Sequence, residues 1–137
     1  MTPSSTTSLD TPTDRVSAAG PALSVLMADS FDAAGIAALE QQGCQVRIDP
    51  SLEGDDLVSA IADHDPTVLV VRSTKVSAEA IAAGTRLGLI VRAGAGYDTI
   101  DITAASAQGI PVANCPGMNA VAVAELAWGL IISCDRR

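Results

Sequence analysis

The stretch "TVLVVRSTKVSAEAIAAGTRLGLIVRAGAG", residues 67–96, decides the fold class. It begins with a continuous β-branched run at 67–71, passes through a helical pattern at 77–85 and returns to an apolar run at 87–91. Continuous apolar runs are typical of parallel strands covered on both faces. Ser77 is well suited to be the N-cap of the helix between them. The stretch therefore predicts a strand–helix–strand unit with parallel strands.

The same alternation extends on both sides of this unit. Further strands are expected at 22–29, 44–48 and 110–114, and further helices at 32–43, 52–64, 101–109 and 119–137. Gly43 and Gly109 stand where glycine commonly ends a helix. Alternating strands and helices joined by right-handed crossovers predict an α/β fold with a flavodoxin-like, doubly wound parallel sheet.

Residues 1–22 differ in composition from the rest of the chain. They are rich in Ser, Thr, Pro and Ala and contain no hydrophobic run of the kind that a secretory signal needs. Such a segment buries too little apolar surface to offset the entropy of ordering it. We therefore expect a disordered tail, followed by a globular domain over 23–118.

The overall composition excludes several classes of partner. The formal net charge of −8 disfavours non-specific binding to nucleic acid or to an anionic membrane. The chain has one Phe, one Tyr and one Trp, too few aromatic rings for a base-stacking surface. The three cysteines are widely spaced and form no metal-binding motif, so no metal site is expected. An odd number of cysteines fits a reducing compartment, and we expect a cytoplasmic protein.

One part of the chain reverses the negative average. The window 72–92 holds four of the eight basic residues and a single acidic residue. Arg72 follows one expected strand and Arg92 follows the next, and the carboxyl ends of parallel strands share one edge of the sheet, where ligands bind. The alternative is a solvated basic face. The shared edge favours an anion site.

The segment "GAGYDT", residues 94–99, fails as a dinucleotide-binding fingerprint. Gly94 and Gly96 fit the first two glycines, but Thr99 stands where the third would be, and no acidic residue follows at the required distance. The glycines can still expose backbone N–H groups to a carboxylate or phosphate. The alternative is a turn that needs a positive φ.

Other candidate residues indicate less. His64 stands at a helix end without a visible partner, which is typical of a surface histidine. Asp29, at the end of the first strand, suggests a phospho-acceptor receiver domain. Arg72, Ser73 and Asn114 occupy the places where that class needs an acidic residue and a lysine. An FMN-binding flavodoxin is disfavoured because aromatic residues that could cover the flavin are missing.

The last expected helix, 119–137, is apolar on nearly all sides. It is too short, and too closely flanked by polar residues, to span a bilayer. A helix of this kind needs a surface to pack against. We therefore expect the chain to be a piece of a longer protein in which a second domain begins at this helix.

Four motifs occur in a fixed order: "RSTKV" (72–76), "RAGAGYDTID" (92–101), "GIPVANCP" (109–116) and "VAELAWGLI" (123–131). In this combination they resemble the N-terminal region of the D-2-hydroxyacid dehydrogenases. The resemblance covers about residues 24–137 and is greatest to the phosphoglycerate dehydrogenase branch of that family.

The resemblance implies a role for each part of the chain. Residues 23–118 would be a flavodoxin-like substrate-binding domain, and 119–137 would be the first helix of a Rossmann NAD-binding domain. The residues implied to bind a small anionic substrate are Arg72, Ser73, Arg92, Gly94, Ala95, Gly96 and Asn119. Ala95 would also lie near the NAD cofactor. The catalytic Arg, Glu and His of the family lie further along the chain, so no catalytic residue is expected here.

The implied activity is oxidation of 3-phospho-D-glycerate with NAD, in L-serine biosynthesis, by a homo-oligomeric full-length enzyme of which this piece alone is inactive. The alternatives are a glyoxylate or hydroxypyruvate reductase and a non-catalytic ligand-sensing relative. The chain departs from the family pattern at three places. The "RSTKV" loop is one residue shorter than usual, Ala95 replaces a threonine of some members, and Ala122 replaces a frequent serine.

Overall fold

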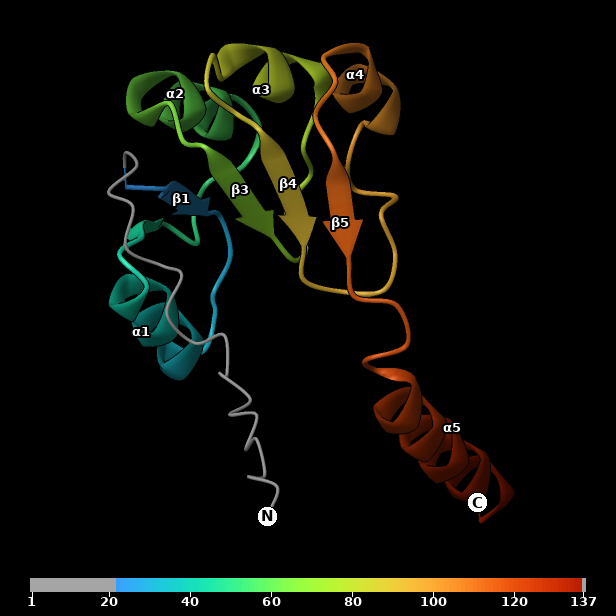
Figure 1. Cartoon of the computed structure of the whole chain (residues 1–137). Coiled ribbons are helices and arrows are strands. Elements are labelled where there is room, and N and C mark those ends of the chain that lie inside the picture. Colours follow the sequence, from blue (N-terminus) through green and yellow to red (C-terminus); the bar gives the residue numbers. More distant parts are fainter. Residues whose placement is uncertain (1–21, 137) are drawn as a thin grey trace, which may run out of the picture.

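The computed structural model describes residues 22–136. They form one parallel sheet (Figure 1) of β1 (Ser24–Met27), β2 (Gln45–Ile48), β3 (Val68–Val71), β4 (Leu89–Arg92) and β5 (Val112–Asn114). The strand order is β2-β1-β3-β4-β5, which is the flavodoxin-like order. The predicted fold class is therefore confirmed. The tail expected at 1–22 lies, except for Ala22, outside the described residues.

Helices cover the two faces of this sheet unequally. The helices are α1 (Ala33–Gln41), α2 (Gly54–His64), α3 (Ala78–Ala83), α4 (Ile102–Ala107) and α5 (Ala120–Asp135). α2, α3 and α4 lie together on one face, whereas α1 lies on the other, beside β1 and β2 (Figure 1).

Local capping places the helices where the sequence predicts them. The Ser77 hydroxyl accepts the N–H of Ala80 at 3.3 Å and caps α3. The Asp101 carboxylate accepts the N–H of Ala104 at 2.9 Å and caps α4. Gly43, just beyond α1, has φ of +83°, a left-handed conformation that favours glycine.

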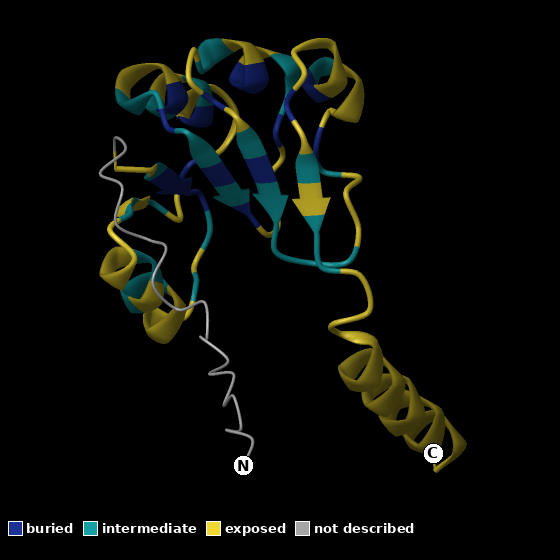
Figure 2. Cartoon of the chain, in the orientation of Figure 1, coloured by how far each residue is buried: buried dark blue, intermediate teal, exposed yellow. Residues whose placement is uncertain are grey.

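The main core lies between the sheet and the layer formed by α2, α3 and α4. Its largest fully buried side chains, each at most 1% exposed, are Leu26, Leu57, Ile61, Leu69, Val71, Val76, Ile81 and Ile90. On the opposite face, α1 contains no buried residue. Alternate residues of β3 and β4 that point to this face, such as Val70 and Leu89, are half-buried (Figure 2).

α5 extends away from the sheet, and all of its residues are exposed (Figures 1 and 2). Its apolar residues include Val121, Trp128 and Leu130, which are 73%, 66% and 58% exposed. Among residues 22–136, no helix is long and apolar enough to cross a membrane. The helix is thus apolar on all sides, as predicted, but no surface of the described chain covers it.

Candidate anion-binding site

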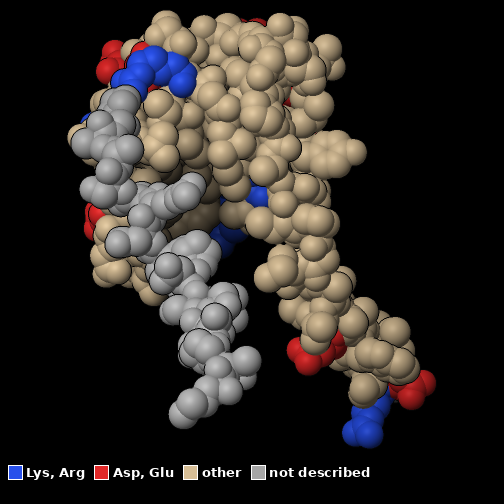
Figure 3. Space-filling view, viewed as in Figure 1, with Lys and Arg blue, Asp and Glu red and all other residues tan. Residues whose placement is uncertain are grey.

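A cavity of about 420 to 570 Å³ is found at each of two places on the sheet, and the larger one lies beyond the carboxyl ends of β3, β4 and β5. The larger is lined by Arg72, Ser73, Arg92, Ala93, Gly94, Ala95, Cys115, Met118 and Asn119. This lining holds two guanidinium groups and no carboxylate. Figure 3 shows Lys and Arg atoms in the hollow beneath the sheet domain.

The register of the strands brings the two arginines together. Val71 is paired with Arg92, so Arg72 leaves β3 one residue beyond the level at which Arg92 ends β4. Arg92 is also paired with Asn114, which places the segment after β5 at the same edge. Parallel strands with this register present their carboxyl-end residues side by side.

Six of the seven residues predicted to bind substrate line this cavity. The exception is Gly96, which is exposed and lies against its own turn: a Cβ there would be 2.8 Å from Asp98 Oδ1. The sequence analysis missed Ala93, Cys115 and Met118. Their signal was position alone, because Ala93 lies inside the arginine–glycine loop and the other two follow β5.

The basic window 72–92 divides between different surfaces. Lys75 lines two neighbouring hollows in place of the cavity that holds Arg72. Arg86 precedes β4 and so lies at the opposite edge of the sheet from Arg92. Two of the four basic residues in this window therefore define the candidate anion site.

The loop that carries Arg72 is tied to the end of β1. Asp29 Oδ2 accepts the backbone N–H groups of Arg72, Ser73 and Thr74 at 2.6, 3.1 and 3.2 Å. Burial by itself would raise the pKa of Asp29, but these N–H groups outweigh it and hold the pKa below its usual range. The Thr74 hydroxyl adds a bond to the carbonyl of Ala28 at 3.0 Å.

Gly94 provides the space in which the Arg92 side chain lies. A Cβ at position 94 would be 2.7 Å from Arg92 Cζ, so any larger residue would displace the guanidinium group. Arg92 Nε is buried and has no hydrogen-bond partner within residues 22–136. The N–H of Gly94 was predicted to face a carboxylate, but it already donates to the carbonyl of Arg92 at 2.8 Å.

The rest of this loop is positioned from β5. Asn114 Nδ2 donates to the carbonyl of Ala95 at 2.7 Å, and the N–H of Cys115 donates to the carbonyl of Gly94 at 2.9 Å. Within residues 22–136, the N–H groups of Ala95 and Gly96 have no protein acceptor. The loop therefore keeps two successive backbone donors beside the two guanidinium groups.

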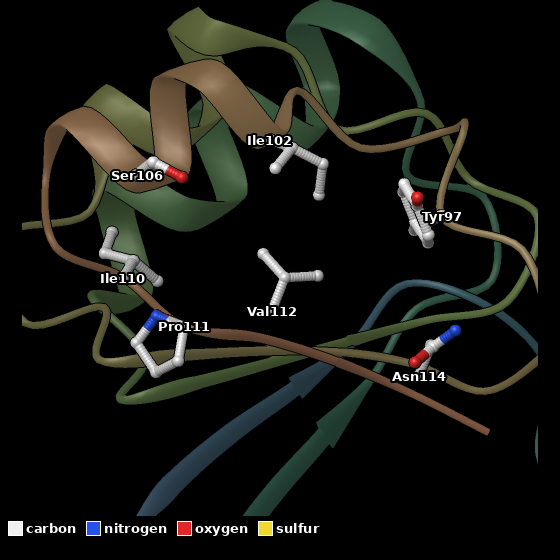
Figure 4. A pocket seen from close by; sticks show the side chains of 7 residues that line it. All are labelled: Tyr97, Ile102, Ser106, Ile110, Pro111, Val112 and Asn114. Atoms are coloured by element: carbon white, nitrogen blue, oxygen red, sulfur yellow. The ribbon is translucent and has the colours of Figure 1, made fainter. Parts of the chain in front are cut away.

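The smaller cavity lies between α4 and the edge strand β5 (Figure 4). Its lining residues are Tyr97, Ile102, Ser106, Ile110, Pro111, Val112 and Asn114. None of them carries a charge. It offers apolar surface and three polar groups, so it is less suited to an anion than the cavity with Arg72 and Arg92.

The glycine loop was also tested as a dinucleotide cradle. Gly96 is followed by a turn and by an isolated bridge between Val76 and Ile100, and α4 begins only at Ile102. A dinucleotide loop must lead directly into a helix whose N-terminus meets the pyrophosphate. Residues 22–136 thus form no cradle for NAD, and they contain no cluster of three metal-ligating residues.

The fold and the cavity agree with the family that the chain matches. Residues 25–129 match the family model described as "D-isomer specific 2-hydroxyacid dehydrogenase, catalytic domain". This match covers most of the chain, so the protein belongs to the D-isomer specific 2-hydroxyacid dehydrogenase family. The resemblance found in the sequence is confirmed.

Relatives with two different names are similar to this chain. It is 36% identical over 116 residues to D-3-phosphoglycerate dehydrogenase of Archaeoglobus fulgidus, which covers 84% of this chain and 22% of the relative. It is 52% identical over 86 residues to hydroxypyruvate reductase of Thermotoga maritima, which covers 62% of this chain and 28% of the relative. The chain therefore spans little more than a fifth to a quarter of these relatives' lengths.

A solved structure supports the same assignment. The structure of NAD+-bound 3-phosphoglycerate dehydrogenase from Entamoeba histolytica superimposes with a TM-score of 0.71 at 36% sequence identity. The superposition covers 81% of this chain and 38% of that one.

Proposed function

We propose that this chain is the substrate-binding part of an NAD-dependent dehydrogenase that oxidises 3-phospho-D-glycerate to 3-phosphohydroxypyruvate. The observation that carries the proposal is the pairing of Arg72 and Arg92 in a cavity whose lining contains no carboxylate. Relatives named D-3-phosphoglycerate dehydrogenase support the choice of substrate. The same reaction would serve L-serine biosynthesis.

The proposed substrate carries an anionic group at each end. A guanidinium group can hold a carboxylate or phosphate with two parallel hydrogen bonds. In this proposal Arg72 and Ser73 bind one anionic end and Arg92 binds the other, assisted by the N–H groups of Ala95 and Gly96. Contacts at both ends fix the orientation of the carbon between them, and that positioning is the contribution of this chain to catalysis.

The redox chemistry would belong to the rest of a longer protein. Hydride transfer needs the nicotinamide of NAD, which accepts the hydride, and an acid–base group that takes the hydroxyl proton. We assign the domain boundary to residue 118 and residues 119–137 to the start of an NAD-binding domain. Ala95 would lie near the cofactor and Asn119 near the substrate. A cytoplasmic, homo-oligomeric full-length enzyme is part of the same proposal.

The test is a titration of the ¹⁵N-labelled chain with 3-phospho-D-glycerate and, separately, with D-glycerate, followed by amide chemical shifts. We expect Arg72→Ala to weaken binding of the phosphorylated ligand about tenfold, as loss of one charge-assisted contact would. It should weaken D-glycerate binding far less. Arg86→Ala is the matched control, because it removes the same charge at the opposite edge of the sheet. Equal losses for both ligands would refute a phosphate contact at Arg72.

The second candidate function is that of a hydroxypyruvate reductase. The 52% identity to the Thermotoga maritima enzyme supports it. The unphosphorylated substrate has one anionic end, so a single guanidinium group would suffice. Equal affinity of the unsubstituted chain for D-glycerate and 3-phospho-D-glycerate would favour this second function.

A further inference from the structure

We propose that Asp29 is a positioning residue of the anion site: its carboxylate fixes the backbone of residues 72–74 and so holds the Arg72 and Ser73 side chains at the cavity. The inference rests on the proposed function in one respect, namely that the cavity binds an anion. Asp29 does not line the cavity itself. It acts through the loop.

The geometry around Asp29 is that of an anion nest filled from within the protein. Three successive backbone N–H groups, those of Arg72, Ser73 and Thr74, converge on the single oxygen Oδ2. Successive N–H groups in a turn form a concavity that binds anions. Here the anion is a side chain that is 43 to 45 residues away in sequence.

The position of this nest in the sheet explains its consequence for ligands. The strand order reverses between β1 and β3, and open parallel sheets bind ligands at such a switch point. Asp29 follows β1 and Arg72 follows β3, so the carboxylate occupies the backbone donors of the switch point. An incoming anion is left with the neighbouring place between β3 and β4, where side chains do the binding.

Asp29 is also central to the order of the loop. Arg72 and Ser73 are exposed, and the other side-chain bond of the loop, from Thr74 Oγ1 to the carbonyl of Ala28, ends on the same strand. The hydrogen bonds to Asp29 are charge-assisted, a class stronger than neutral hydrogen bonds. The lowered pKa of Asp29 is consistent with a carboxylate that stays ionised in this position. Without it, three N–H groups lose their acceptor together.

Positioning and charge predict opposite results when Asp29 is changed. The residue is negative and lies next to a site proposed to bind an anion. If its charge were what mattered to the ligand, removing that charge would strengthen anion binding. If it positions the loop, removing it weakens anion binding even though the repulsion is relieved.

Two aspartates provide matched controls. Asp49 follows β2 at the same edge of the sheet, but its carboxylate accepts only local bonds from Ser51, at 2.6 and 3.1 Å. Asp65 accepts backbone N–H groups of Thr85 and Arg86, at 2.7 and 2.9 Å, at the opposite edge. The first control removes the same charge, and the second removes the same kind of bond.

The experiment titrates the labelled chain with 3-phospho-D-glycerate and measures amide hydrogen exchange. We expect Asp29→Asn to raise the dissociation constant about five- to tenfold, and Asp49→Asn and Asp65→Asn to change it less than about twofold. Exchange at the amides of 72–74 should accelerate in Asp29→Asn alone. Asp29→Glu keeps the charge but moves the carboxylate by one methylene, so it should weaken binding as well. If Asp29→Asn fails to fold, Asp29→Glu decides the question by itself.

Several results would overturn the inference. Binding by Asp29→Asn or Asp29→Glu that is as tight as in the unsubstituted chain, or tighter, would show that the loop does not need this carboxylate. An equal loss in Asp65→Asn would show a general effect of stability. Failure of the proposed function looks different: the unsubstituted chain would not bind the ligand, or Arg72→Ala would bind it unchanged. In that case faster exchange at 72–74 would still measure the loop.

Discussion

The two faces of the sheet are built from the same kinds of residue but differ in how they are covered. On one face α2, α3 and α4 bury Leu26, Leu69 and Ile90 to 1% exposure or less. On the other face α1 packs beside β1 and β2, and residues such as Val70 and Leu89 stay half-buried. Strands that are apolar on both sides indicate two covered faces. Within residues 22–136, one face is fully packed and the other is covered in part.

This difference separates what makes the chain fold from what awaits further contacts. The packed layer contains the buried cluster that holds the strands in register, and it therefore positions the edge at which Arg72 and Arg92 meet. The partly covered face and the exposed α5 contribute little burial of their own. The candidate site depends on the first region and should tolerate changes in the second.

The largest expected effect tests this difference with one kind of substitution on each face. Leu69→Ala should lower the free energy of unfolding by about 3 kcal/mol, because it leaves a cavity in a fully buried position. Leu89→Ala, on the partly covered face, should cost about 1 kcal/mol, because less surface is taken from water. Urea unfolding followed by circular dichroism measures both. Equal losses would mean that the second face is as well packed as the first.

Much of the fold could be predicted from the sequence, because it is encoded in short-range patterns. The β-branched run at 67–71, the Ser77 cap and the glycine at 43 each act within a few residues of the chain, and each element was found where it was expected. The meeting of Arg72 and Arg92 was also predictable, because strand order in a parallel sheet places consecutive carboxyl ends at one edge.

The parts that could not be predicted depend on contacts between distant residues. Asp29 was considered as a phospho-acceptor because its position at a strand end is visible, whereas its bonds to residues 72–74 are not. In the same way, the space that Gly94 leaves for Arg92 and the displacement of Gly96 from the cavity depend on side-chain and turn conformations. Periodicity locates strands and helices, but it does not specify how loops fold.

A second, smaller effect concerns pH and the helices of the packed layer. Asp65, just after α2, accepts bonds from the hydroxyl of Thr85 and the N–H of Arg86. These bonds lower its pKa below the usual value of 3.8. A carboxyl group whose pKa is lower in the folded state stabilises the fold above its unfolded pKa, and this contribution is lost as the pH falls through the folded pKa.

We therefore expect Asp65→Asn to lower the melting temperature near neutral pH, and the difference from the unsubstituted chain to shrink below about pH 4. Asparagine is the suitable replacement because Asp65 has φ of +41°, a conformation that asparagine tolerates. Asp32→Asn is the control on the other face, since the Asp32 side chain makes no capping bond to α1. A pH-independent difference, or an equal effect at Asp32, would contradict the prediction.

The smallest effect on unfolding is expected in α5, where the comparison between covered and exposed surfaces is most extreme. Trp128→Ser and Leu130→Ser remove apolar side chains that are 66% and 58% exposed, so the free energy of unfolding of the sheet domain should change by less than about 0.5 kcal/mol. Their effect should appear in self-association instead. An exposed apolar helix favours contacts between copies of the chain, and we expect the unsubstituted chain to dimerise or aggregate.

Sedimentation velocity at several concentrations, with binding of a hydrophobic dye, measures this association. The two α5 substitutions should shift the chain toward monomer and reduce dye binding. Leu23→Ser, an equally apolar change at a 53% exposed residue before β1, should do neither. If the unsubstituted chain sediments as a clean monomer and binds no dye, then α5 does not act as an uncovered apolar surface in solution. The contrast between this helix and the packed layer would then be smaller than its exposure suggests.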